Sequence, residues 1–145
     1  MATVFDVAKY ILEKKKESMS TWKLQKLCYY AQAWTLAWEG KELFPEEFQA
    51  WSNGPVCEPL FQEHKGLFWI DSSKLKRGNK TALTPKAKEN VDIIIRDYGK
   101  KDAYWLREQT HGEDPWKNAR KGLPEGVNSE ETITKESMGL YYGGR

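Results

Sequence analysis

One apolar segment, between Ser20 and Gly40, constrains the fold more than any other feature of this 145-residue sequence. The hydroxyl of Ser20 or Thr21 can cap the start of a helix, and Gly40 can adopt the left-handed conformation in which helices commonly end. Apolar side chains recur at helical spacing on one broad face: Leu24, Leu27, Cys28, Tyr30, Ala31, Trp34 and Trp38. A helix this apolar for its length is normally buried. The pattern therefore predicts a helix over residues 21–39 at the centre of the fold.

Other helices are predicted on both sides of the central one. Thr3 precedes an apolar stripe that ends at residues 14–16, where lysines suit the negative end of a helix. Thr84 and Asp114 each stand before a proline, which is tolerated in a first helical turn because its missing N–H has no partner there. We also expect shorter helices over residues 56–64, 102–110 and 116–121, and another after Thr134.

A short strand is predicted around Phe48 and Ala50, where apolar residues alternate imperfectly before a turn at residues 53–55. No repeat, linker or low-complexity segment divides the chain, and its length is typical of one domain. The predicted fold class is therefore mainly α. We expect a single compact multi-helix domain over residues 1–145 with a small antiparallel β patch, either a hairpin or three strands.

Composition narrows the class of protein. The net charge is +2, from 23 basic and 21 acidic residues, so a nucleic-acid partner is not favoured. The apolar stretches are too short to span a bilayer, and the first residues lack a secretory signal, so we expect a cytoplasmic protein without membrane contact. Cys28 and Cys57 are expected to be free thiols there. About two thirds of the tryptophans are expected to fill the core, because indole is a large apolar group.

The motifs that carry catalysis are missing from the sequence. Cys57 and His64 could form a thiol–imidazole pair if Cys57 were exposed, but no local signature supports one. The chain has no CxxC, HxxxH or HExxH pattern for a metal and no glycine-rich phosphate loop. We therefore expect no enzyme activity, no cofactor and no metal site.

The segment from Thr110 to Trp116 is the densest group of chemically versatile residues. His111 lies at a predicted turn between helices, where a rigid frame can present a functional side chain. In one interpretation, His111 and Glu113 hydrogen-bond across the turn while Trp116 fills the core. In the other, these residues contact a partner. Arg120 could stack on the Trp116 indole or pair with a carboxylate.

A basic cluster supports an alternative function. Its members are Lys74, Lys76, Arg77 and Lys80, all in one predicted loop. Such a loop could contact phosphates and bind DNA in a salt-dependent way, as in a regulator or a phage accessory protein. No helix lined with Arg, Asn and Gln accompanies it, so a solvated loop is the simpler interpretation.

Three ordered blocks of the sequence resemble the Panacea domain, also called the SocA-like antitoxin domain, which is common in phage and bacterial genomes. The first block is Lys-Leu-Gln-Lys-Leu-Cys-Tyr-Tyr-Ala-Gln-Ala-Trp at residues 23–34, and the second is Phe-Gln-Ala-Trp-Ser-Asn-Gly-Pro-Val at residues 48–56. The third runs from Thr110 and His111 through Glu113, Pro115 and Trp116 to Ala119 and Arg120. Residues 52 and 53 depart from the family, which often has an aromatic residue there.

The resemblance implies a mostly helical antitoxin that neutralises an adjacently encoded toxin by direct protein contact. It also implies a second kind of partner, since the SocA member is similar to an adaptor that delivers its toxin to a cytoplasmic protease; no protease-docking segment can be identified in this chain. The candidate partner-binding residues are Trp51, His111, Glu113, Trp116 and Arg120. Nothing in the sequence identifies the toxin.

Overall fold

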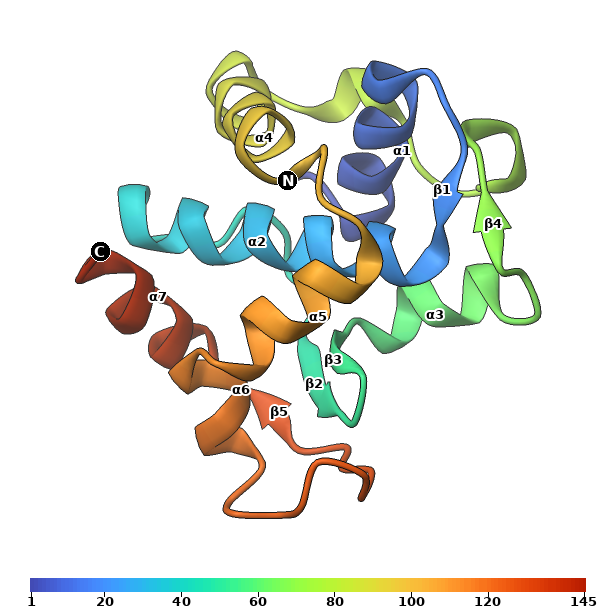
Figure 1. Cartoon of the computed structure of the whole chain (residues 1–145). Helices are drawn as coiled ribbons and strands as arrows, with labels where there is room; N and C mark the ends of the chain where they lie inside the picture. Colours follow the sequence, from blue (N-terminus) through green and yellow to red (C-terminus); the bar gives the residue numbers. More distant parts are fainter.

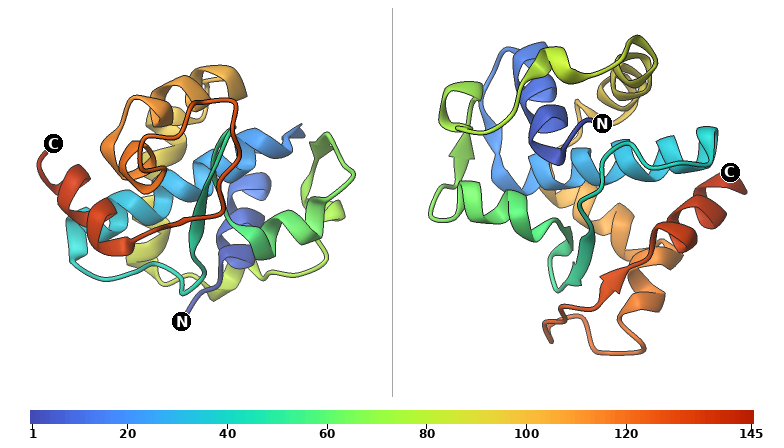
Figure 2. Two further views of the ribbon diagram at one scale, coloured as in Figure 1. Left: turned by 90° about the horizontal axis from the view of Figure 1, so that it is seen from below. Right: turned by 180° about the vertical axis from the view of Figure 1, so that it is seen from behind.

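Helix α2 (Thr21–Glu39) runs through the middle of the molecule in a computed structural model that describes all 145 residues. Helices α1 (Val4–Lys15) and α4 (Pro85–Tyr98) lie on one side of it (Figure 1). Helices α6 (Asp114–Ala119) and α7 (Lys135–Gly143) lie on the other side, with α7 packed along α2 (Figure 2). Helices α3 (Glu58–His64) and α5 (Ala103–His111) complete the set. The predicted mainly helical fold and the central place of residues 21–39 are confirmed.

The β structure consists of two small antiparallel sheets. Strand β2 (Phe48–Trp51) lies between β3 (Gly54–Val56) and β5 (Thr132–Ile133), so the predicted patch has three strands. A second pair joins β1 (Met19–Ser20) to β4 (Trp69–Ile70), with Met19 opposite Ile70. The sequence did not predict this second pair, because two-residue strands are too short to show an alternating pattern. Two 3₁₀ turns, at Ser72–Lys74 and Lys80–Ala82, follow β4.

Local capping signals set most helix ends. Thr3 and Asp6 form a capping box at the start of α1, and the Ser20 hydroxyl accepts from the Lys23 N–H at 3.1 Å. Thr84 and Thr134 cap α4 and α7 in the same way, and Gly40 ends α2 with φ +71°.

Two short helices differ from their predicted bounds. Helix α6 begins at Asp114 rather than at residue 116, because Glu113 takes the cap position and Pro115 falls in the first turn. Helix α3 begins at Glu58 rather than at residue 56, because residues 54–56 pair with β2 as a strand.

The core is built from tyrosine, phenylalanine and aliphatic side chains rather than from tryptophan. Tyr29, Tyr30, Tyr142, Phe44 and Phe48 are among its largest fully buried members. Of the seven tryptophans, one alone (at position 116) is buried, those at 22, 34 and 51 are half-buried, and those at 38, 69 and 105 are exposed. The expectation that about two thirds of them fill the core is therefore wrong. On the central helix α2, Tyr29 and Tyr30 are buried, whereas Trp22 and Trp34 are half-buried and Trp38 is exposed.

Both cysteines are free and buried, so the alternative of an exposed Cys57 is also wrong. Burial raises the pKa of the Cys57 thiol to about 12 and that of Cys28 well above its usual value, which keeps both thiols protonated. None of the helices combines the length and the apolar character needed to cross a bilayer.

Candidate partner-binding site

The three sequence blocks, residues 23–34, 48–56 and 110–120, pack against one another, and we call their meeting place the motif junction. The Trp116 indole N–H donates to the Trp51 carbonyl at 2.9 Å, which joins α6 to β2. The Tyr30 hydroxyl donates to Glu113 Oε1 at 2.8 Å, which joins α2 to the start of α6. Hydrogen bonds donated by the side chains of Trp116 and Tyr30 thus join residues that are 65 and 83 positions apart in the chain.

Gln25 fastens Cys57, the residue that follows the second block, to α2. Its side-chain amide accepts from the Cys57 N–H at 2.8 Å and donates to the Cys57 carbonyl at 3.2 Å. The same nitrogen lies 3.0 Å from His64 Nε2, and burial lowers the pKa of this imidazole. The His64 ring is therefore hydrogen-bonded to the Gln25 amide, while Cys57 is anchored through its backbone.

Glu113 lies at the centre of a buried cluster of hydrogen bonds. Its Oε1 accepts from the Tyr30 hydroxyl at 2.8 Å and from the Tyr142 hydroxyl at 2.7 Å, and its Oε2 accepts from Gln109 at 3.2 Å. Tyr29 adds a contact of 3.3 Å to the Tyr142 hydroxyl. Burial first, and then the charges of neighbouring groups that include Glu113, raise the pKa values of Tyr30 and Tyr142, so both hydroxyls remain donors. The carboxylate is thus held by neutral groups.

Lys26 is a second buried ionisable group, and its ammonium nitrogen has no hydrogen-bond partner. The Trp22 ring centroid lies 5.4 Å from this nitrogen. Burial, with a smaller contribution from the Arg107 charge, lowers the pKa of Lys26 to about 7. Gly54 leaves the space for this side chain: it has φ +113°, and a Cβ there would come within 2.4 Å of Lys26 Cε.

His111, Trp116 and Arg120 form a stack. The rings of His111 and Trp116 are nearly parallel, at 8° with centroids 3.8 Å apart, and the Arg120 guanidinium lies 4.8 Å from the Trp116 ring centroid. His111 Nδ1 is 2.9 Å from Glu125 Oε1, and burial, partly offset by Glu125, lowers the pKa of His111. The predicted stacking of Arg120 on the indole is confirmed. The predicted hydrogen bond between His111 and Glu113 is wrong, because each has other partners.

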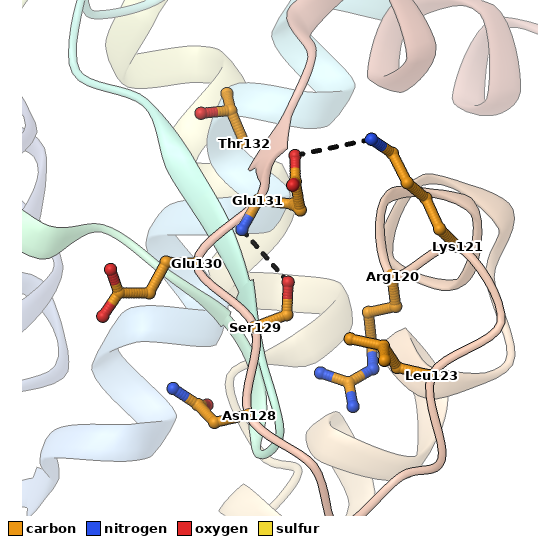
Figure 3. Close-up of a pocket in the computed structure, with 8 residues that line it drawn as sticks. All are labelled: Arg120, Lys121, Leu123, Asn128, Ser129, Glu130, Glu131 and Thr132. Carbon is orange, nitrogen blue, oxygen red and sulfur yellow. Dashed lines mark hydrogen bonds and ion pairs between the residues drawn. The ribbon is translucent and has the colours of Figure 1, made fainter.

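Arg120 also holds the segment that follows α6. Its guanidinium donates to the Ala50 carbonyl at 2.9 Å, to the Pro124 carbonyl at 2.8 Å, and to the carbonyls of Glu125 and Val127. Figure 3 shows the guanidinium beside Leu123, in the shallow pocket that it shares with residues of the 121–132 segment. The Arg120 side chain therefore ties this loop to strand β2.

The candidate partner-binding residues divide into two groups by exposure. Glu113, Trp116 and Arg120 are 8%, 4% and 2% exposed, so their side chains act inside this chain. Trp51 and His111 are half-buried and still reach the surface. Partner contact by any of the five stays a prediction, but the burial of the first three indicates that they shape the site rather than touch a partner.

Several residues of the junction were missed from the sequence. Gln25 and Lys26 lie inside the first block, but their polar character hid their burial. Tyr142 lies outside all three blocks, and only its place in a predicted terminal helix hinted at packing. Glu125 lies in a loop that carries no pattern at all.

A possible metal-ligand set is already occupied by an arginine. Oxygen or nitrogen atoms of Glu108, His111 and Glu125 lie within 4.8 Å of one another. The Arg107 guanidinium pairs with Glu108 and approaches Glu125 at 3.9 Å. A fixed cation among the ligands opposes a second one, so we interpret this group as an ion-pair network.

The basic segment of the alternative hypothesis is exposed, but much of its charge is paired within the chain. Lys74 lies 3.6 Å from Asp71, and Lys80 lies 3.6 Å from Glu13. The Arg77 guanidinium stacks on the Phe5 ring at 3.8 Å, and neither Arg77 nor Lys76 makes an ion pair. Binding of phosphates through these four residues stays a prediction, and the pairing weakens it.

The fold and the junction define a mainly helical domain in which three separate sequence blocks pack together. The family model described as the SocA-like antitoxin, Panacea domain, matches residues 24–117, which is almost two thirds of the chain. The chain belongs to this family. No curated protein and no solved structure matched the chain.

Proposed function

We propose that this chain is the antitoxin of a toxin–antitoxin pair and that it neutralises its toxin by direct protein–protein binding, without catalysis. The observation that carries the proposal is the match to the antitoxin family over residues 24–117, which spans the motif junction from α2 to α6. The toxin would be encoded beside this chain.

The chemistry of the junction supports binding over catalysis. The reactive side chains are engaged with one another: the carboxylate of Glu113 with tyrosines, His111 with Glu125 and Trp116, and His64 with Gln25. General acid–base catalysis needs a side chain free to reach a substrate proton. These groups rigidify a framework, which favours the binding of a protein by a preformed surface.

The surface next to the junction has the composition of a protein interface. The half-buried His111 ring lies 2.9 Å from Glu125, which Arg107 also approaches at 3.9 Å. Arg107 donates to Asn53 at 3.4 Å, two residues after the half-buried Trp51, whose ring packs against Phe61. Partly buried aromatic rings with a polar surround are typical of interaction hot spots. We propose that Trp51 and His111 contact the toxin.

The experiment is co-expression of the chain with the product of the adjacent gene in a bacterial host. We expect that product to stop growth alone and growth to return when both proteins are made, with the two proteins co-purifying. Trp51→Ala and His111→Ala should each weaken co-purification by about tenfold or more, as interface aromatics do. Leu140→Ala, at an exposed apolar residue on α7, is the matched control.

A harmless adjacent product, or a toxic one whose effect the chain does not relieve, would refute the proposal. Rescue of growth without co-purification would refute direct binding. If rescue disappeared in a host lacking a cytoplasmic protease while co-purification remained, delivery to that protease would replace simple occlusion as the mechanism.

A further inference from the structure

A surface pocket beside the Glu113 cluster has a composition that neither the family match nor the sequence blocks explain. Four aromatic residues from three helices line it: Trp34 of α2, Tyr98 of α4, and Tyr141 and Tyr142 of α7. The carboxylates of Glu108 and Glu113 and the last residue, Arg145, line it as well. The C-terminal halves of α2 and α7, which supply three of these aromatic residues, lie together at one end of the molecule (Figure 1).

The pocket contains an acidic group that lacks a cationic partner. The three donors to Glu113 are two hydroxyls and an amide, all neutral. None of the ion pairs of the structure includes Glu113, although Glu108 at the rim pairs with Arg107. A buried carboxylate without a counter-charge attracts a cation strongly, because the surroundings screen it less than water does.

The aromatic rings are held in place around this charge. The Trp34 indole N–H donates to the Tyr98 hydroxyl at 3.0 Å, and Tyr98 stacks on Tyr30 at 4.2 Å with an interplanar angle of 7°. Tyr141 packs against Tyr142 in an edge-on contact at 4.9 Å. The rings are therefore fixed in position, and an aromatic ring attracts a cation that lies over its open face.

The chain itself places a guanidinium at this pocket. The Arg145 guanidinium carbon lies 4.4 Å from the Tyr141 ring centroid, and its Nη2 donates to the Tyr141 hydroxyl at 2.6 Å. Arg145 is exposed and makes no ion pair. A planar cation thus fits against Tyr141, and this one is held at the rim by a single tyrosine.

We propose that this pocket binds the guanidinium group of an arginine side chain of a protein partner, which displaces Arg145 and approaches Glu113. The proposal rests on the proposed function in so far as that partner is the toxin. An arginine fits better than a lysine, because a planar guanidinium can stack on a tyrosine face while donating to a carboxylate.

The test is a titration of the purified chain with Nα-acetyl-arginine amide, followed by NMR at the Trp34 indole N–H. The neutral probe of the same shape, Nα-acetyl-citrulline amide, is the matched ligand control. We expect saturable shifts with the arginine probe and binding at least about tenfold weaker with the citrulline probe, since a charge-assisted hydrogen bond is lost. The corresponding lysine derivative should also bind more weakly than the arginine one.

Three variants locate the binding. Glu113→Gln keeps an acceptor for the tyrosine hydroxyls while removing the charge, and it should weaken the arginine probe about tenfold. Tyr141→Ala, at the surface, should do the same without a large change in thermal unfolding. Arg145→Ala should tighten binding severalfold, because it removes the competing guanidinium.

Equal binding of the arginine and citrulline probes, or no saturable shift, would overturn the proposal, and equal binding of the lysine derivative would overturn the assignment to guanidinium. If Glu113→Gln fails to fold, Tyr141→Ala and Arg145→Ala decide the question. Failure of this proposal can be distinguished from failure of the antitoxin proposal. If the Tyr141→Ala variant neutralises the toxin as well as the wild type does, the pocket has no role in neutralisation. If the chain binds the arginine probe but neutralises no toxin, only the antitoxin function is refuted.

Discussion

Glu113 and Lys26 are both buried in the motif junction, but their polar atoms have opposite surroundings. Glu113 accepts hydrogen bonds from Tyr30, Tyr142 and Gln109, whereas the Lys26 nitrogen has no acceptor at all. A buried charge persists when dipoles replace its water, and a buried amine without them loses its proton instead. Of these two groups, Glu113 is therefore well supported by hydrogen bonds, whereas Lys26 lowers stability near neutral pH.

Removing the Glu113 carboxylate has the largest expected effect on stability. Glu113→Ala leaves three donors without an acceptor and opens a cavity, so we expect a loss of about 3–5 kcal/mol in the free energy of unfolding. Glu113→Gln, which retains both oxygen and size, should cost much less. Urea unfolding at pH 7 measures both, and similar values for the two variants would contradict this account of Glu113.

Removing the Lys26 amine, which has no hydrogen-bond partner, should stabilise the protein. Lys26→Met keeps the length of the side chain but not its amine, and we expect a gain of about 2–4 kcal/mol at pH 7. The exposed Lys86 provides the matched control, since Lys86→Met should change little. Destabilisation by Lys26→Met would show that the amine has a partner in solution.

The same variant should change how stability depends on pH. The pKa of Lys26 is about 7 in the folded chain and ordinarily 10.5, so the unfolded chain binds a proton between these values that the folded chain does not. The wild-type free energy of unfolding should therefore rise as the pH rises from 7 toward 10. Lys26→Met should lack this part of the rise in urea titrations at a series of pH values.

A substitution at Gly54 tests how the backbone makes room for the Lys26 side chain. Gly54→Ala brings a Cβ within 2.4 Å of Lys26 Cε at a φ of +113°, and we expect a loss of about 2 kcal/mol. In a double-mutant cycle with Lys26→Ala, part of this loss should disappear, because the clash is removed and the backbone strain remains. If the stability losses of Gly54→Ala and Lys26→Ala were fully additive, the clash with Lys26 would be excluded as a cause of the loss in Gly54→Ala.

The substitution with the smallest expected effect removes one hydrogen-bond donor of the Glu113 cluster. Tyr142→Phe removes one of the two hydroxyls that donate to Glu113 Oε1, and we expect it to cost about 1 kcal/mol. Tyr141→Phe, next to it in the chain, removes a hydroxyl that contacts only the exposed Arg145, and thermal unfolding should not change measurably. Equal effects of the two would mean that the cluster adds nothing specific.

The sequence predicted what local signals determine. Thr3, Ser20 and Thr84 cap helices through contacts within a few residues, and the strand at Phe48 lies next to its own turn, so these elements could be placed in advance. The fold class follows from them.

What the sequence could not predict depends on partners far along the chain. Glu113 meets Tyr30 and Tyr142 only after α2, α6 and α7 have packed, so the predicted contact with nearby His111 was the wrong choice. Lys26 appeared to be an ordinary polar residue of a helix, since nothing local reveals that Gly54 makes room for it. The pairing of β1 with β4 was not predicted either, because strands of two residues are too short to show an alternating pattern.

The way Arg120 holds residues 124–127 has a consequence for how such a framework can diversify. The guanidinium recognises carbonyl oxygens of the main chain, which every amino acid supplies, and makes no demand on the side chains of the loop. Substitutions at an exposed position such as Val127 should therefore preserve these main-chain contacts while altering what the loop displays. One scaffold can in this way acquire a new binding preference through a few exchanges in a loop, without redesign of its interior.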